Sequence, residues 1–99
     1  MKINQNREAE KLTLAIEGRL DTTTAPELEK ACDSILDGVS ELVFDMTNLE
    51  YVSSAGLRVL LKVQKVMARR GKLKLVGVNE TVMEVFEITG FSDILTIEK

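Results

Sequence analysis

Two adjacent serines, Ser53 and Ser54, are the side chains best placed for chemistry, because a helical pattern of apolar residues begins at Ser54. The first N–H groups of a helix lack partners within it, and the helix dipole makes that end favourable for an anion. The first turn carries no acidic side chain that would already fill this role. The position is therefore open to an anion, such as a phosphate carried by one of the serines. The alternative is that one serine only caps the helix, which needs no function.

A glycine two residues further on, Gly56, favours the functional interpretation. Glycine inside a helix costs roughly 1 kcal/mol relative to alanine, but it lets another surface approach the backbone closely. A phosphate on Ser54 would add about −1.5 to −2 charges at the helix start, where the dipole tolerates them. An approaching protein surface would not tolerate them equally, so the serine could switch binding without remodelling the fold.

Enzymatic chemistry has little support in the chain. Histidine is absent, which removes the usual general base, the most common metal ligand and any Ser-His-Asp arrangement. The single cysteine, Cys32, falls among apolar positions of a predicted helix and is expected in the core. The basic run at residues 69–72 lacks the order of a phosphate-binding loop, and Asp45 is expected to bond loop amides. We expect no catalysis, no cofactor and no metal site.

Length and charge limit the class of protein. The 99 residues are 44% hydrophobic and 29% charged, enough for one domain over residues 1–99. The 13 basic and 16 acidic residues give a net charge of −3, which argues against nucleic acid as a partner. No apolar run reaches the roughly 18 to 20 residues of a membrane span, and the start is polar. We expect a cytoplasmic protein with a protein partner or small ligand and no membrane insertion.

The serines must be positioned by strands that alternate with helices. Period-two patterns predict an edge strand at residues 2–7 beside a strand at 11–17, and apolar runs predict strands at 41–46, 73–78 and 94–97. Helical spacing predicts helices at residues 25–37, 54–70 and between Asn79 and Gly90, with a loop at 47–52. The order β-β-α-β-α-β-α-β predicts an α/β fold, a mostly parallel or mixed sheet with helices packed on it.

Further positions follow from this arrangement. Thr24 and Glu27 fit a capping box at the start of the first helix, and Gly38 is expected to stop that helix. The polar loops 18–24 and 47–56 follow strands, and functional groups gather at that edge of such sheets. A basic stripe on the second helix is either a solvated face or a contact for an acidic partner. The stripe comprises Arg58, Lys62, Lys65 and Arg69.

Several of these segments together resemble the STAS-domain anti-sigma factor antagonists of bacteria. The resemblance covers nearly the whole chain and is most specific over residues 45–61. The segments that carry it are Gly18-Arg19-Leu20-Asp21, Thr24-Ala25, Phe44-Asp45-Met46, Tyr51-Val52-Ser53-Ser54-Ala55-Gly56-Leu57 and Gly71 before a strand.

The resemblance implies a single STAS-like domain that acts by partner switching. In such a system the unphosphorylated antagonist binds an anti-sigma factor, which is also an ATP-dependent serine kinase, and thereby frees a sigma factor. Phosphorylation ends the complex, and a serine phosphatase reverses it. By position the phosphate acceptor matches Ser54, with Ser53 as the competing site, and the family's loop aspartate matches Asp21 beside it. The expected partner-binding residues are Asp21, Thr22, Ser53, Ser54, Gly56, Arg58 and Lys62.

Two departures and one rival function accompany this hypothesis. Ser53 stands where the family often has aspartate, and Ala55 stands where a second hydroxyl residue is frequent. The first removes a charge beside Ser54, and the second leaves Ser54 as the only hydroxyl on its side of the helix. The rival function is a STAS accessory subunit of a membrane transporter, of the lipid-trafficking ATPase type, which docks through the same loop without phosphorylation.

Overall fold

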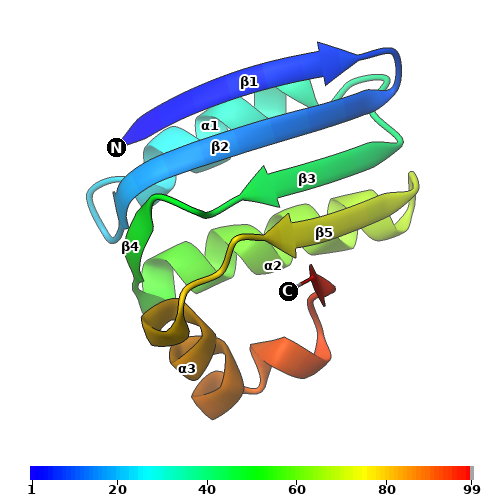
Figure 1. Cartoon of the computed structure of the whole chain (residues 1–99). Helices are drawn as coiled ribbons and strands as arrows, with labels where there is room; N and C mark the ends of the chain where they lie inside the picture. The colour runs from blue at the N-terminus through cyan, green and yellow to red at the C-terminus, as the bar shows by residue number, and fades with distance from the viewer. Residues whose placement is uncertain (99) are drawn as a thin grey trace.

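The computed structural model describes residues 1–98, except for the side chain of Ile35, and shows a sheet with helices behind it (Figure 1). The strands run β1-β2-β3-β5-β6 across the sheet, and β4 pairs with the far end of β2. Only β1 and β2 are antiparallel, so the sheet is mixed, as predicted. The strands are β1 (Lys2–Glu8), β2 (Lys11–Leu20), β3 (Glu41–Asp45), β4 (Leu49–Val52), β5 (Lys72–Val76) and β6 (Ile97–Glu98).

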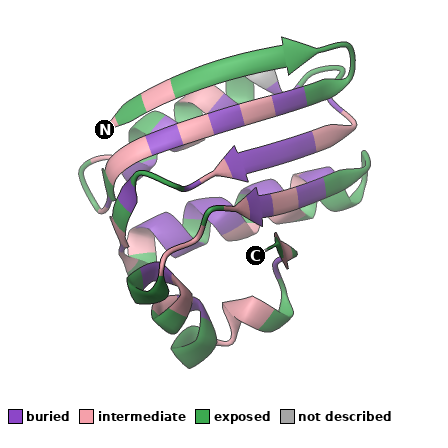
Figure 2. Cartoon of the chain, viewed as in Figure 1, coloured by how far each residue is buried: buried purple, intermediate pink, exposed green. Residues whose placement is uncertain are grey.

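Alternating residues determine which face of the sheet is covered. Leu12, Leu14 and Ile16 of β2 are almost fully buried, whereas Thr13 and Ala15 between them are half-buried. This is the period-two pattern of a strand with one face on the core. Figure 2 shows the alternation along β2 beside the largely exposed edge strand β1. The sequence therefore predicted both the pairing of β1 with β2 and the buried face correctly.

The helices pack their apolar side chains against the buried face of the sheet. They are α1 (Ala25–Ile35), α2 (Ser54–Ala68) and α3 (Glu80–Thr89), followed by a short 3-10 turn η1 (Phe91–Asp93). Helices α1 and α2 lie on the same side of the sheet, and α3 lies near the start of α2 (Figure 1). One cluster of buried side chains joins all three helices to the sheet. Its fully buried members include Leu28, Phe44, Leu60, Met67 and Phe86.

Two helix ends follow the predicted local signals. Asn79 caps α3 by accepting a hydrogen bond from the Val82 N–H at 2.8 Å. Gly90 ends α3 in the left-handed conformation, with φ of 82°, which glycine adopts without a steric penalty. No helix within residues 1–98 has the length and apolar character to cross a bilayer.

Residues 47–52, predicted as a loop, contain strand β4. The strand is only four residues long, and just its end residues, Leu49 and Val52, are buried. It pairs in parallel with residues 18–20 at the end of β2, with an irregularity in the register between Gly18 and Arg19. The partner is therefore distant in sequence, and four residues give too short a pattern to identify the strand.

The capping box predicted for α1 is also wrong. Thr24 is the N-cap, but its side chain makes no capping bond. Its hydroxyl instead donates to the Arg19 carbonyl at 2.7 Å, which closes the loop before the helix. The helix ends at Ile35, two residues earlier than predicted, where Arg70 donates to the Leu36 carbonyl at 2.6 Å. The last predicted strand, residues 94–97, shrinks to Ile97–Glu98 after η1.

Candidate functional site

The two polar loops meet at one edge of the sheet because the strands before them are parallel neighbours. Leu20 at the end of β2 is in register with Val52 at the end of β4. The Ser53 N–H donates to the Leu20 carbonyl at 2.8 Å, which ties the start of α2 to β2. Asp21 and Ser53 therefore follow directly from paired residues, and the predicted meeting of the two loops is confirmed.

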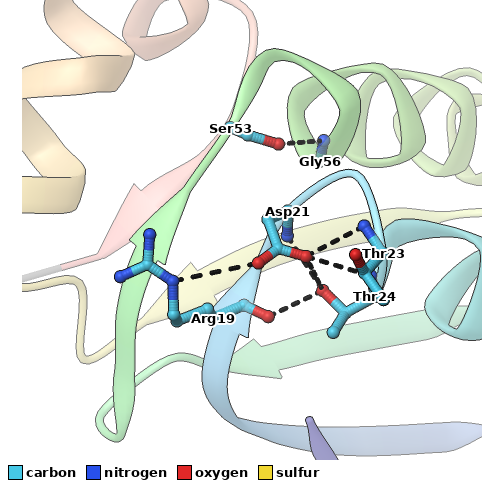
Figure 3. Close-up of polar contacts among 6 residues, drawn as sticks. All are labelled: Arg19, Asp21, Thr23, Thr24, Ser53 and Gly56. Carbon is cyan, nitrogen blue, oxygen red and sulfur yellow. Dashed lines mark hydrogen bonds and ion pairs between the residues drawn. The ribbon is translucent and has the colours of Figure 1, made fainter.

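The two serines have different structural roles at the start of α2. Ser53 is extended, with φ of −96° and ψ of 175°, and its hydroxyl accepts from the Gly56 N–H at 3.3 Å (Figure 3). Its carbonyl accepts the first intrahelical bond, from the Leu57 N–H at 2.9 Å. Ser53 is thus the helix cap. Ser54 is the first helical residue and is exposed, and its hydroxyl makes no hydrogen bond with residues 1–98.

The helix start around Ser54 has the electrostatic character that the sequence predicted. The first turn of α2 contains no acidic side chain. The helix start therefore has no acidic side chain of its own to balance the positive end of the helix dipole. A hydroxyl in this position is accessible to a modifying enzyme, and a phosphate on it would be stabilised by the helix end.

Asp21 organises the neighbouring loop. One of its carboxylate oxygens accepts from the N–H groups of Thr23 at 3.0 Å and Thr24 at 3.1 Å (Figure 3). The Asp21 N–H in turn donates to the Thr24 hydroxyl at 2.8 Å. The bond from the Thr24 N–H is the main cause that lowers the pKa of Asp21 below its usual value of 3.8. Asp21 is therefore a carboxylate whose orientation is fixed by its own loop.

Arg19 contacts both the Asp21 carboxylate and strand β4. Its guanidinium lies 3.8 Å from the second carboxylate oxygen of Asp21 and stacks over the Tyr51 ring, 4.6 Å from the ring centre. The stack joins β2 to β4. Neither Arg19 nor Tyr51 was among the predicted partner-binding residues. Arg19 of β2 is in register with Tyr51 of β4, so the contact could be predicted only if strand β4 had been recognised.

Gly56 has a different role from the predicted partner contact. It is buried, and a Cβ atom at this position would lie 2.6 Å from the Leu20 Cγ and 3.0 Å from the Leu20 carbonyl oxygen. The surface that approaches its backbone is therefore the end of β2, within the same chain. The absence of a side chain brings α2 against β2 and so places Ser54 beside the Asp21 loop.

The basic residues of the predicted site also separate into two groups. Lys62 lies 3.2 Å from the Glu29 carboxylate and 3.8 Å from that of Asp33, both on α1. The hydrogen bond to Glu29 is the main cause that raises the pKa of Lys62. Lys62 thus links α1 to α2 within the chain, whereas its contact with a partner stays a prediction. Arg58 is exposed and forms no ion pair with residues 1–98.

The other residues singled out in the sequence lie in loops or in the core. Thr22 is exposed at the tip of the Asp21 loop. Asp45 accepts from the Thr47 N–H at 3.1 Å and from its hydroxyl at 2.6 Å, as expected of a loop-bonding carboxylate. Cys32 is buried, and burial raises the pKa of its thiol to about 12. Among the described residues no group of three metal-ligating side chains comes together.

Sequence comparison identifies relatives over the whole chain. The family model of the STAS domain matches residues 1–99. The Bordetella bronchiseptica protein BtrV, whose name places it among anti-sigma factor antagonists, is 35% identical over 99 residues, covering 98% of this chain and 85% of BtrV. The anti-sigma-B factor antagonist of Listeria monocytogenes is 31% identical over 97 residues, covering 95% of this chain and 84% of that protein.

Solved structures show the same fold. The anti-sigma factor antagonist SpoIIAA in its unphosphorylated form superposes with a TM-score of 0.81 at 19% identity, covering 99% of this chain and 89% of SpoIIAA. SpoIIAA of Bacillus in its phosphorylated form gives a TM-score of 0.75 at 16% identity, covering 99% and 92%. An anti-sigma factor antagonist of Mycobacterium paratuberculosis gives 0.87 at 21% identity, covering 97% and 83%. At these identities the likeness concerns the fold.

Proposed function

The chain belongs to the STAS-domain family of anti-sigma factor antagonists, and from that premise we propose that it is a partner switch controlled by phosphorylation of Ser54. In the unphosphorylated state it binds an anti-sigma factor that is also a serine kinase, and so releases a sigma factor. Phosphorylation by that kinase ends the complex, and a serine phosphatase restores it. The chain itself is a binding protein in the cytoplasm, without catalytic activity.

One observation supports this proposal most directly. The hydroxyl of Ser54 is exposed at the first position of α2, whereas the neighbouring Ser53 hydroxyl is engaged as the helix cap. Modification of Ser54 leaves the cap bond intact, so the folded state is retained. Modification of Ser53 would remove an acceptor that the Gly56 N–H uses. The structure of the site thus favours Ser54 over Ser53 as the acceptor.

The effect of a phosphate on a partner follows from charge. The Asp21 carboxylate lies at the same edge of the sheet, and the hydrogen bonds of its loop keep it ionised. A phosphate on Ser54 would add about −1.5 to −2 charges to a surface that already carries this anion. A partner surface complementary to the unmodified site would then lose complementarity, because like charges at an interface cost several kcal/mol. Asp21 and Thr22 are the loop residues that such a partner would contact.

The SpoIIAA structures add support from a relative, since that protein has been solved both with and without its phosphate. The names of the curated relatives also favour the anti-sigma function over the transporter-subunit alternative. The genomic neighbourhood discriminates further: a kinase-like anti-sigma gene beside this one supports the proposal, and transporter genes support the alternative.

Intact-mass analysis tests the acceptor. The protein is incubated with ATP and the anti-sigma kinase encoded beside it, with Ser53→Ala and Ser54→Ala treated in parallel. The wild type and Ser53→Ala should each gain the mass of one phosphate, and Ser54→Ala should gain none. Labelling that persists in Ser54→Ala but disappears in Ser53→Ala would move the acceptor to the cap residue and refute the assignment.

A further inference from the structure

A shallow groove of about 650 Å³ follows the outward face of α2, away from the sheet. Its lining residues recur three and four positions apart, so they form one face of the helix. The floor consists of two half-buried apolar side chains, Leu61 and Val66. The rim contains only cationic side chains, which are Arg58, Lys62, Lys65, Arg69 and Arg70.

Two of the five rim cations are already engaged within the chain. Lys62 pairs with carboxylates of α1, and Arg70 donates to the Leu36 carbonyl at the end of α1. The other three, Arg58, Lys65 and Arg69, are exposed and have no ion pair with residues 1–98. They are therefore available to an external anion. Among residues 1–98 no carboxylate lines the groove, so an anionic occupant would complement the charge of these three side chains.

We infer that this groove docks an acidic amphipathic helix of the protein partner, whose carboxylates pair with Arg58, Lys65 and Arg69 and whose apolar side chains rest on Leu61 and Val66. The inference rests on the proposed function, because the groove begins one turn after Ser54. The helical part of the lining, residues 58–68, covers about 15 Å along the axis at 1.5 Å per residue, and Arg69 and Arg70 follow directly. A helix supplies apolar and charged stripes at matching three- and four-residue spacings, and helices pack ridge into groove.

The surroundings of the groove favour a protein helix over an anionic membrane or nucleic acid. Glu29 and Asp33 on α1 lie directly beside Lys62 and would repel a broad, flat anionic surface. The wider apolar face of α2, which includes Leu60, Val63 and Met67, is buried against the core and is unavailable for insertion into lipid. A single narrow helix can instead seat over the three exposed cations that have no ion pair with residues 1–98.

Arg58 connects the groove to the switch. Residues four apart on a helix are neighbours, and helical side chains lean toward the N-terminus, so the Arg58 side chain extends toward Ser54. A phosphate on Ser54 would compete with the partner's carboxylate for this guanidinium. Phosphorylation therefore acts on the groove as well as on the helix tip. An Arg58→Gln variant, in which no such competition exists, should show a smaller ratio between the affinities of unphosphorylated and phosphorylated protein than the wild type.

The test measures binding to the neighbouring anti-sigma kinase by calorimetry at about 50 mM and about 300 mM salt, where exposed charge pairs are screened to different extents. The groove variant is Lys65→Glu with Arg69→Glu, more than two turns from Ser54. The matched control is Lys2→Glu with Lys30→Glu, which changes the net charge equally at exposed sites outside the groove. Unfolding midpoints verify that both variants fold. At low salt the groove variant should bind about ten-fold more weakly than wild type, the control within about two-fold, and the gap should narrow at high salt.

A photo-reactive amino acid in place of Lys65 identifies the occupant by mass spectrometry. A crosslinked partner segment rich in Asp and Glu with helical apolar spacing supports the inference. Equal binding by the groove variant and the control overturns it, as does a crosslink to a second copy of this chain. Binding to vesicles of anionic phospholipid that is lost in the groove variant also overturns it. Ser54→Asp is measured alongside. If Ser54→Asp loses binding while the groove variant does not, the groove inference fails and the proposed function stands. If the groove variant loses binding while Ser54→Asp does not, the proposed switch at Ser54 fails and the groove remains a binding surface.

Discussion

The close approach of α2 to β2 predicts the sign of the stability change in Gly56→Ala. On helix propensity alone, alanine should stabilise this position by up to about 1 kcal/mol. The structure opposes this gain, because the new Cβ would lie 2.6 Å from the Leu20 Cγ and 3.0 Å from both its Cδ2 and its carbonyl oxygen. Leu20 is fully buried, so it cannot move aside into solvent.

The expected magnitude follows from these two opposing effects. Overpacking a well-filled core costs typically about 1 to 3 kcal/mol, and contacts this short belong in the upper part of that range. After the gain in helix propensity, a net loss of about 1 to 2 kcal/mol in the free energy of unfolding remains. For a domain of this size such a loss lowers the melting temperature by about 4 to 16 °C.

Thermal unfolding followed by circular dichroism, together with guanidinium titration, measures the change. Ala55→Gly is the control, because it reports the cost of introducing a glycine at the adjacent position of the same turn. A double-mutant cycle with Leu20→Ala, which removes the Cγ and Cδ2 atoms, should show Gly56→Ala to be less costly in that background. An increase in stability for Gly56→Ala in the wild-type background would refute the close packing of α2 on β2.

Three further outcomes follow from the site. Ser53→Ala should lose about 1 kcal/mol of stability, because the Gly56 N–H loses its capping acceptor, whereas Ser54→Ala should leave the guanidinium midpoint almost unchanged. The lowered pKa of Asp21 means that its carboxylate stabilises the folded state above pH 3.8, and that this contribution disappears as the pH falls through the lower folded value. The stability difference between wild type and Asp21→Asn should therefore be present at pH 7 and vanish in acid; a difference that grows in acid would contradict the loop geometry. The buried Cys32 thiol, with its pKa raised to about 12, should react with iodoacetamide at pH 8 only after unfolding, and rapid labelling of the native protein would show that the thiol is accessible.

The parts of the fold with a strong local signal could be predicted from the sequence. The alternation over residues 11–17 in β2 and the apolar arc of the 15-residue helix α2 each repeat several times, so their period is unambiguous. Asn79 and Gly90 mark the ends of α3 because their roles depend only on local backbone geometry. The start of α2 at Ser54 is also local, and this allowed the exposed hydroxyl to be predicted.

The features that the sequence did not reveal are decided by distant contacts. Strand β4 forms because its partner is the end of β2, some thirty residues earlier, and nothing within Leu49–Val52 reveals that pairing. Lys62 looked like part of a free basic stripe because its acidic partners lie on another helix. Gly56 suggested an external approach, since a sequence does not show which surface comes close to a glycine. In each instance the residue type was compatible with more than one contact, and only the tertiary structure shows which contact is made.

Calorimetric binding to the anti-sigma kinase decides whether phosphorylation of Ser54 controls the interaction with the partner. The protein is measured in three forms: unphosphorylated, phosphorylated by that kinase with ATP, and phosphorylated and then treated with a serine phosphatase. We expect tight binding of the first form, about hundred-fold weaker binding of the second and full recovery in the third, with all three forms equally folded. Equal affinity of the phosphorylated and unphosphorylated forms would contradict the claim that a charge at the tip of α2 controls the partner.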